Sequence, residues 1–308
     1  MRKTKPHKEA DFAVYTTKYF SEYLPSQAGF RENTILSYRD TFLIFLPFLS
    51  YKKKLVPEKL SISDFNRTLI IDFLEYLRTE RKNGDTTRNQ RLATLHSFFK
   101  FVMYEAPVHA ASCQDVLTVD FIKTADKTVN FLTAEGIQAI LEQPDITTKN
   151  GRRDLVLLTT LYDTAARVSE LVTITAGDLQ LESFPTIKVT GKAGKTRTAT
   201  INPQTADLLK QYLKERSLTG VEHRSRPIFS NKSADSLTRA GISHILKKYA
   251  DKAREKHPDL IPKKISPHVI RHSKAMHLLQ AGVNIVYIRD VLGHVSITTT
   301  EIYYDKQV

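Results

Sequence analysis

Apolar residues at helical spacing run through the first 115 residues and restrict this part of the chain to a helical bundle. In segment 34–46, four large residues recur every three or four positions and share one helix face: Ile35, Tyr38, Phe42 and Phe45. The same spacing predicts a helix over 63–78 and another that Thr86 or Thr87 can cap. Pro47 is expected to end or kink the first helix, because its ring excludes an interior helix position.

The second half of the chain combines helical segments with one strand pattern. Two short runs, 186–190 and 196–201, flank a glycine-bracketed turn and predict a β-hairpin. The helical period fades before this half begins, so we expect a helical domain over 1–115, a linker over 116–128 and a second domain over 129–308. The predicted fold class is therefore mainly α with a small antiparallel β-sheet, in two domains.

The charge of the chain indicates a polyanionic partner. Its 46 Lys and Arg residues against 33 Asp and Glu give a formal net charge of +13 and a pI near 9.6. The excess is spread over both halves, which suits a protein that surrounds a polyanion better than one with a single basic tail, although many basic proteins bind nothing anionic. No apolar run reaches the roughly 18–20 residues that a membrane span requires. A single cysteine, Cys113, excludes an internal disulfide and, with no secretory signal, favours the cytoplasm.

A helix start rich in histidine and arginine follows Ser266. Ser266 is a favourable N-cap and Pro267 a favourable first helical residue. His268, Arg271 and His272 then share one helix face, close to the positive end of the helix dipole. This arrangement predicts an anion site. A metal site and a base-reading helix-turn-helix are the alternatives, although the HExxH pattern of zinc enzymes is absent.

Polar residues elsewhere in the second half have ordinary structural explanations when each is taken alone. Arg167 lies three residues before Glu170, which predicts an ion pair. Lys192 lies at the tip of the predicted hairpin, where a solvated turn is the usual outcome. His294 follows a glycine that ends a short predicted helix, and Tyr303 comes nine residues later.

In order and spacing, these residues together resemble the tyrosine recombinase family, the phage integrases and Xer-type recombinases. The matching series is Arg167-x-x-Glu170, Lys192, His268-x-x-Arg271, Leu292-Gly293-His294 and Tyr303. The resemblance covers nearly the whole chain and implies a SAM-like, core-binding N-terminal helical domain and an α+β catalytic domain. It also implies a site-specific recombinase that acts on double-stranded DNA carrying a specific recombination site. The enzyme would be a monomer when free and a homo-tetramer in the synaptic complex, would exchange strands through a Holliday junction, and would need no cofactor, metal or ATP.

The resemblance assigns most of the site to binding of the scissile phosphate. Arg167 and Arg271 would clamp its non-bridging oxygens, a task that suits planar guanidinium groups that stay charged. His268 and His294 would add hydrogen bonds and help to manage the proton of the nucleophile. Glu170 would orient Arg167 from behind.

The covalent step falls to two residues in the same comparison. Tyr303 would attack phosphorus to give a 3′-phosphotyrosyl link, and Lys192 would protonate the leaving 5′ oxygen. Tyr304 adjoins Tyr303, but the spacing from His294 favours Tyr303 as the nucleophile. Basic residues expected to contact DNA elsewhere are Arg88, Arg91, Lys100, Lys195 and Arg197.

Two features depart from the family pattern. Ala166 stands where the family usually has a glycine before the first catalytic arginine, so the turn there is expected to differ. Few residues follow Tyr303, so its segment is expected to be mobile until DNA and neighbouring subunits position it. Two other functions stay open at this point: a type IB topoisomerase, which shares these catalytic residues, and a non-catalytic DNA-binding regulator, which would form no covalent adduct.

Overall fold

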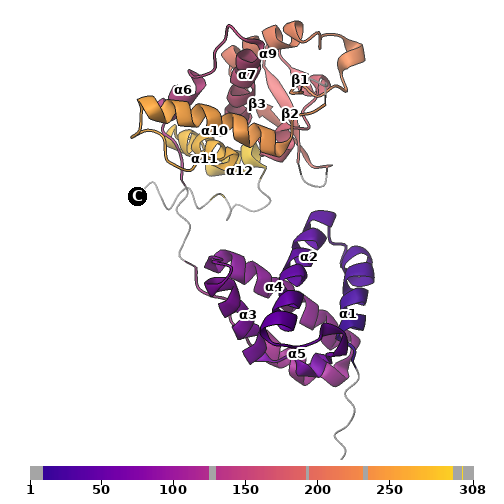
Figure 1. Ribbon diagram of the computed structural model, residues 1–308. Coiled ribbons are helices and arrows are strands. Elements are labelled where there is room, and N and C mark those ends of the chain that lie inside the picture. Colours follow the sequence, from indigo (N-terminus) through magenta and orange to yellow (C-terminus); the bar gives the residue numbers. More distant parts are fainter. Residues whose placement is uncertain (1–9, 125–129, 192–193, 232–234, 294–299, 301–308) are drawn as a thin grey trace, which may run out of the picture. The chain divides into compact units, whose positions relative to one another are not determined.

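The chain forms two compact units, Met1–Asp126 and Lys127–Val308. We describe them from a computed structural model, which covers residues 10–124, 130–191, 194–231, 235–293 and 300 (Figure 1). The first unit is helical and the second combines helices with a small antiparallel sheet, so the predicted fold class is confirmed. None of the helices within these ranges has both the length and the apolar character that a membrane span requires.

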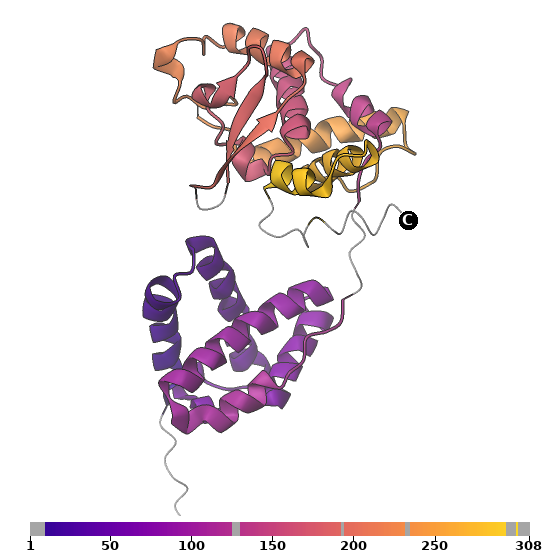
Figure 2. The ribbon, with the colours of Figure 1, turned by 180° about the vertical axis from the view of Figure 1, so that it is seen from behind.

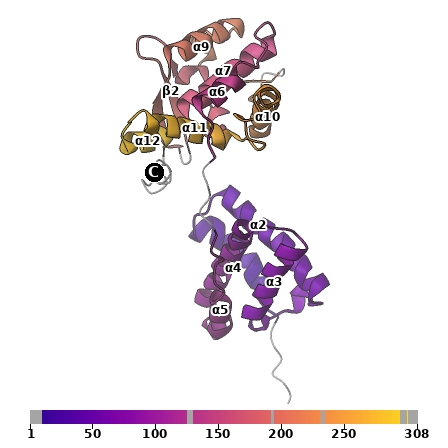
Figure 3. The same cartoon turned by 90° about the vertical axis from the view of Figure 1, so that its left-hand side faces the viewer.

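Helix α4 is the centre of the first unit and contacts α2, α3 and α5 (Figure 3). The bounds are α1 (Phe12–Lys18), α2 (Glu32–Pro47), α3 (Arg67–Thr79), α4 (Asp85–Glu105) and α5 (Ala110–Leu117), with π-helical segments Tyr19–Gln27 and Phe48–Lys52. The core is aromatic: the buried ring of Phe98 on α4 makes edge contacts with Phe12, Tyr19 and Phe42. Edge-to-face packing of this kind adds to the burial of apolar area and fixes the helices around α4.

Two helix starts in the first unit differ from the prediction. Helix α3 begins at Arg67 rather than near residue 63, because the Asn66 side chain accepts a hydrogen bond from the N–H of Leu69 at 2.9 Å. Helix α4 begins at Asp85, so both predicted cap residues, Thr86 and Thr87, lie inside its first turn. At Pro47 the α-helix ends, as expected, but the chain continues into the π-helical segment.

The end of the first unit reaches further than the sequence indicated. Helix α5 was not predicted, and Val116 and Val119 are buried in the aromatic core, although both lie in the predicted linker. Beyond them, the Asn89 side chain holds the backbone of Ile122 on both sides. Its amide donates to the Ile122 carbonyl at 2.8 Å and its oxygen accepts from the Ile122 N–H at 2.9 Å. Residues 116–122 therefore belong to the first unit.

In the second unit, α7 contacts β3, α6, α9 and α11 and forms the scaffold on which the other elements pack (Figures 1 and 2). The bounds are α6 (Ala134–Leu141), α7 (Lys149–Thr164), α8 (Val168–Leu171), β1 (Leu179–Gln180), β2 (Thr186–Thr190), β3 (Thr196–Thr200), α9 (Pro203–Glu215), α10 (Arg239–Lys256), α11 (Pro267–Gln280) and α12 (Ile285–Leu292). The sheet is antiparallel in the order β1-β2-β3, and the predicted hairpin is confirmed as β2 and β3. Strand β1 was missed because two residues are too short to show an alternating pattern.

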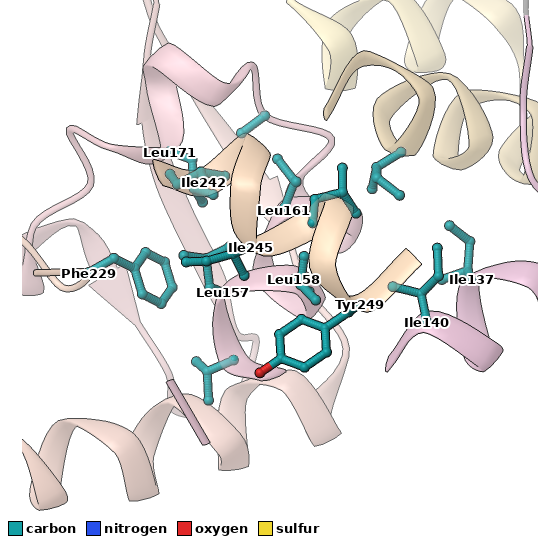
Figure 4. Packing of buried hydrophobic residues seen from close by; sticks show 14 of the residues in the cluster. Ile137, Ile140, Leu157, Leu158, Leu161, Leu171, Phe229, Ile242, Ile245 and Tyr249 are labelled. Carbon is teal, nitrogen blue, oxygen red and sulfur yellow. The ribbon is translucent and has the colours of Figure 1, made fainter. Parts of the chain in front are cut away.

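The core of the second unit fixes α7 along its length. Figure 4 shows Leu157, Leu158 and Leu161 of α7 packed against Ile242, Ile245 and Tyr249 of α10 and Ile137 and Ile140 of α6. The phenol of Tyr249 donates to the buried carboxylate of Asp154, one turn from the start of α7, at 2.9 Å. The C-terminal end of α7 is therefore a rigid support for the turn that follows it.

The first residues of the second unit are tied to α11. The N–H of Leu132 donates to Ser273 Oγ at 2.8 Å, and its carbonyl accepts from His277 Nε2 at 2.9 Å. The other ring nitrogen of His277 accepts from the Tyr162 hydroxyl at 2.8 Å. The N–H and the carbonyl of Leu132 are thus both bound by side chains, as are the N–H and the carbonyl of Ile122 in the first unit.

Candidate active site

The turn that ends α7 brings Arg167 to the start of α8. Ala165 adopts a left-handed conformation, with φ 47° and ψ 31°, and is fully buried. A residue with a β-carbon costs about 1 kcal/mol there relative to glycine. The next peptide N–H, of Ala166, donates to Thr164 Oγ1 at 3.2 Å. The residue in the left-handed conformation is thus Ala165. The departure from the family pattern lies one residue later, at Ala166.

The predicted pairing of Arg167 with Glu170 is confirmed. Arg167 Nη1 lies 2.7 Å from Glu170 Oε1, and the Arg167 backbone N–H donates to Oε2 at 2.9 Å. The Glu170 side chain is 3% exposed, whereas that of Arg167 is 36% exposed. The carboxylate therefore holds a partly accessible guanidinium from its buried side.

A second arginine, Arg197 of β3, also binds Glu170. Its Nη1 lies 3.0 Å from Oε2. Burial raises the pKa of the Glu170 carboxyl, but the hydrogen bond from the Arg167 N–H and the charges of Arg197 and Arg167 outweigh it, so the pKa lies below its ordinary value. Glu170 is therefore ionised at neutral pH, as a buried carboxylate between two cations should be.

Arg271 connects three helices. It lies on α11, is 3% exposed, and donates from Nη1 to the Ala165 carbonyl at 2.7 Å and from Nη2 to the Leu292 carbonyl. These acceptors are at the C-terminal ends of α7 and α12, where carbonyls lack partners within their own helix. Ser266 occupies the predicted N-cap position of α11, and Pro267 is its first residue. The guanidinium is thereby fixed close to the Arg167 turn.

The histidines of α11 are held in their neutral form. Partial burial lowers the pKa of His268, and the charges of Arg271 and Arg167 lower it further. Burial, with His268 and Arg271 nearby, lowers the pKa of His272 to about 4. The two rings lie 6.4 Å apart between centroids. At neutral pH the positive charge of this region therefore comes from the arginines.

We expect His272 to make the stability of the second unit depend on pH. An unfolded chain protonates this side chain near its ordinary pKa of 6.5, whereas the folded chain does so near 4. The contribution of neutral His272 to the free energy of unfolding is therefore fully present above pH 6.5. It is lost as the pH falls from 6.5 to 4, which lowers that free energy by roughly 2–3 kcal/mol. Urea unfolding of the wild type and of His272→Asn across this range measures the effect. An equal decrease in both proteins would contradict it.

Helix α12 ends where the sequence predicted. The Asn284 side chain accepts from the N–H of Val286 at 2.8 Å, and Gly293 adopts the left-handed conformation with φ 61°. A β-carbon on Gly293 would lie 3.3 Å from Cδ of Arg197. The left-handed backbone favours glycine here, and the lack of a side chain also eases the close approach of Arg197.

Several predicted site residues lie outside the described residues: Lys192, His294, Tyr303 and the neighbouring Tyr304. The described catalytic candidates lie together at the end of α7. Glu170 pairs with both Arg167 and Arg197, and Arg271 binds the Ala165 carbonyl of the same turn. The charges of Arg271 and Arg167 also lower the pKa of His268. Within the described ranges, no group of three His, Cys, Asp or Glu side chains could hold a metal ion.

Known proteins share this architecture. Residues 130–308 match the phage integrase family, and residues 17–106 match the phage integrase N-terminal SAM-like domain. The chain belongs to the phage integrase family. Tyrosine recombinase XerD of Listeria innocua is 31% identical to it over 287 residues, covering 92% of this chain and 91% of the relative. Tyrosine recombinase XerC of Roseiflexus sp. is 32% identical over 288 residues, covering 92% and 87%. The resemblance to tyrosine recombinases is therefore confirmed.

Solved structures of phage integrase relatives have the same fold. XerH site-specific recombinase bound to its difH substrate aligns with a TM-score of 0.68 at 24% identity, over 89% of this chain and 76% of that one. The Tn1549 transposon integrase in complex with circular intermediate DNA aligns with a TM-score of 0.72 at 17% identity, over 93% of each chain. The two-domain architecture predicted from the sequence is thus that of known recombinases.

The arginines expected to contact DNA in this integrase-family chain have partners within the protein. Arg88 donates to the Leu74 carbonyl and pairs with Asp85, and Arg91 donates to the Ser37 carbonyl and to Thr41. The Arg197 side chain is 13% exposed and pairs with Glu170. By contrast, Lys100 and Lys195 are exposed. The sequence showed the charge of these residues but not the distant carbonyls that bind the arginines.

Proposed function

We propose that this chain is a site-specific DNA recombinase that cleaves and rejoins strands through a 3′-phosphotyrosyl intermediate on Tyr303. The observation that carries the proposal is the convergence of Arg167 and Arg271 on the turn after α7. Arg271 binds the carbonyl of Ala165, and Arg167 follows two residues later. Two oriented guanidinium groups suit the two non-bridging oxygens of a phosphodiester.

In the proposed reaction, the Tyr303 oxygen attacks phosphorus while the bond from phosphorus to the 5′ oxygen breaks. The phenol has an ordinary pKa near 10, so surrounding cations favour loss of its proton. Neutral His268, with His294, is proposed to accept that proton, and Lys192 to give one to the leaving 5′ oxygen. The products are a 3′-phosphotyrosine and a free 5′-hydroxyl.

Rejoining is the reverse of cleavage, with a 5′-hydroxyl of another strand as the attacking group. The phosphotyrosyl bond conserves the energy of the phosphodiester, so ATP is not consumed in this scheme. Arg167 and Arg271 stabilise the charge on phosphate in both directions, the task that a divalent metal performs in other enzymes. We further propose that residues 129–308 form the catalytic domain, that residues 1–115 contribute to DNA binding, and that four subunits exchange strands through a Holliday junction.

The test is incubation of the full chain with a nicked candidate site, followed by denaturation. A covalent protein–DNA adduct with a free 5′-hydroxyl supports the proposal. Relaxation of supercoiled DNA that lacks any specific site would instead indicate a topoisomerase. Specific binding without an adduct would indicate a regulator and would contradict the proposal.

We also expect DNA binding to weaken steeply with salt. A protein that neutralises several phosphates releases their counterions, so affinity should fall on the order of 10³-fold between 50 and 200 mM salt. The net charge of +13 is consistent with such a footprint. Fluorescence anisotropy with a labelled duplex measures the slope, and a flat dependence would argue against a DNA clamp.

A further inference from the structure

We propose that Arg197 is a positioning residue of the active site, which locks the end of α12 to the Arg167 turn rather than contacting DNA. This inference rests on the proposed function, because it concerns how the arginine cluster of that reaction is held. From its charge alone, Arg197 was expected to contact DNA, and this inference gives it a different role.

The guanidinium of Arg197 joins three elements with three nitrogens. Its Nε donates to the Val291 carbonyl near the end of α12 at 2.6 Å, and Nη2 donates to the Thr164 carbonyl at the end of α7 at 3.3 Å. Its Nη1 pairs with Glu170 on α8 at 3.0 Å. A planar group with donors in fixed directions sets the relative orientation of all three acceptors, which an ammonium group cannot do.

The backbone of Gly293, at the end of α12, also lies close to the Arg197 side chain. A β-carbon there would lie 3.3 Å from Cδ of Arg197, a tight contact, so the Arg197 side chain reaches close to the backbone of Gly293. Gly293 is also the residue that precedes His294 in the chain. The aliphatic part of Arg197 therefore packs on the end of α12 while its guanidinium binds the carbonyl of Val291.

The shared carboxylate extends the connection to the β-hairpin. A β-carbon on Gly191, at the end of β2, would lie 3.1 Å from Glu170 Oε1. The N–H of Gly191 donates to the Lys195 carbonyl at 2.7 Å and closes the base of the hairpin. Glu170 and Arg197 thus form a single charged centre at the meeting point of the α7 turn, the hairpin base and the end of α12.

The two roles predict different results for Arg197→Lys. If Arg197 positions the site, DNA affinity and its salt dependence should stay unchanged, while single-turnover cleavage falls by about tenfold to a hundredfold, as expected for a misplaced catalytic group. If Arg197 contacts a phosphate, affinity should fall in the neutral variant Arg197→Gln and its salt slope should decrease by about 1, because lysine would keep the charge. The second result would overturn the proposal.

Arg254 is a matched control within the same unit. It also donates to two backbone carbonyls and one carboxylate, those of Ile261, Pro262 and Asp251, but these partners lie outside the arginine cluster. Arg254→Lys should lower the melting temperature as Arg197→Lys does, yet leave cleavage at the wild-type rate. Equal losses of cleavage in both variants would show that Arg197 acts through general stability, and would overturn the proposal.

A second variant tests the same contact from the other side. Gly293→Ala should also reduce cleavage, and combining it with Arg197→Lys should cost less than the product of the two separate losses, because both disrupt one contact. Independent effects would contradict the proposal, even if Arg197→Lys folds poorly. If the wild type forms no adduct at all, the proposed function fails. If it forms one and Arg197→Lys cleaves at the same rate, the positioning role alone fails.

Discussion

Tyr303→Phe is expected to abolish the covalent protein–DNA adduct, whereas Tyr304→Phe is expected to retain it. Phenylalanine keeps the ring and removes the only atom that could attack phosphorus, so cleavage should fall below detection. Denaturing electrophoresis of protein trapped on a nicked, labelled site separates the two variants. Both tyrosines lie outside the described ranges, and Tyr303 is preferred to Tyr304 for its spacing from His294.

The paired design makes the assignment of the nucleophile decisive. Tyr303→Phe should still bind the duplex with wild-type affinity, because the arginines that would hold the phosphate are unchanged. An adduct that persists in Tyr303→Phe and disappears in Tyr304→Phe would transfer the role to Tyr304. An adduct that persists in both would exclude this pair as the nucleophile.

Arg271→Ala is expected to lose both cleavage and stability. Removing the buried guanidinium leaves the carbonyls of Ala165 and Leu292 without this donor and opens a cavity, so the free energy of unfolding should fall by about 2–4 kcal/mol. Cleavage should fall on the order of 10²–10³-fold through the lost stabilisation of phosphate charge. DNA affinity should change far less, because other phosphate contacts remain.

Separating the two effects of Arg271→Ala requires measurements on folded protein. Urea unfolding gives the loss of stability, and single-turnover cleavage well below the melting temperature gives the loss of rate. Arg153→Ala is a suitable comparison, since it removes one of the two partners described for the buried Asp154, away from the arginine cluster. It should reduce stability and leave cleavage intact. Wild-type cleavage by folded Arg271→Ala would contradict the proposed phosphate clamp.

Local signals in the sequence were sufficient for much of the fold and part of the site. Apolar spacing predicted α2 and α4, glycines and β-branched residues predicted the hairpin, and Asn284 and Gly293 marked the ends of α12. The pairing of Arg167 with Glu170 followed from a separation of three residues. In each case the determining contacts lie within a few positions along the chain.

The features that the sequence did not reveal depend on distant contacts. The partners of Arg197 lie 27, 33 and 94 residues away, so its charge alone indicated a surface role. The left-handed backbone of Ala165 is stabilised by its surroundings, including the bond from Arg271, and alanine has no preference for that conformation. Helix α5 is short, and its burial against α4 determines its position more than its own propensity does.

The backbone groups of Ile122 and Leu132 are each held by side chains of their own unit. This has a consequence for exchanging domains between related recombinases. A chimera that joins the N-terminal domain of one protein to the catalytic domain of another must leave each anchored peptide with its own partner, Asn89 in one case and Ser273 with His277 in the other. A fusion junction at residue 115 would take the segment after it from a foreign protein and lose the packing of Val116 and Val119 in the first unit. Junctions within residues 123–131 keep both halves intact and are the natural place to graft one specificity onto another.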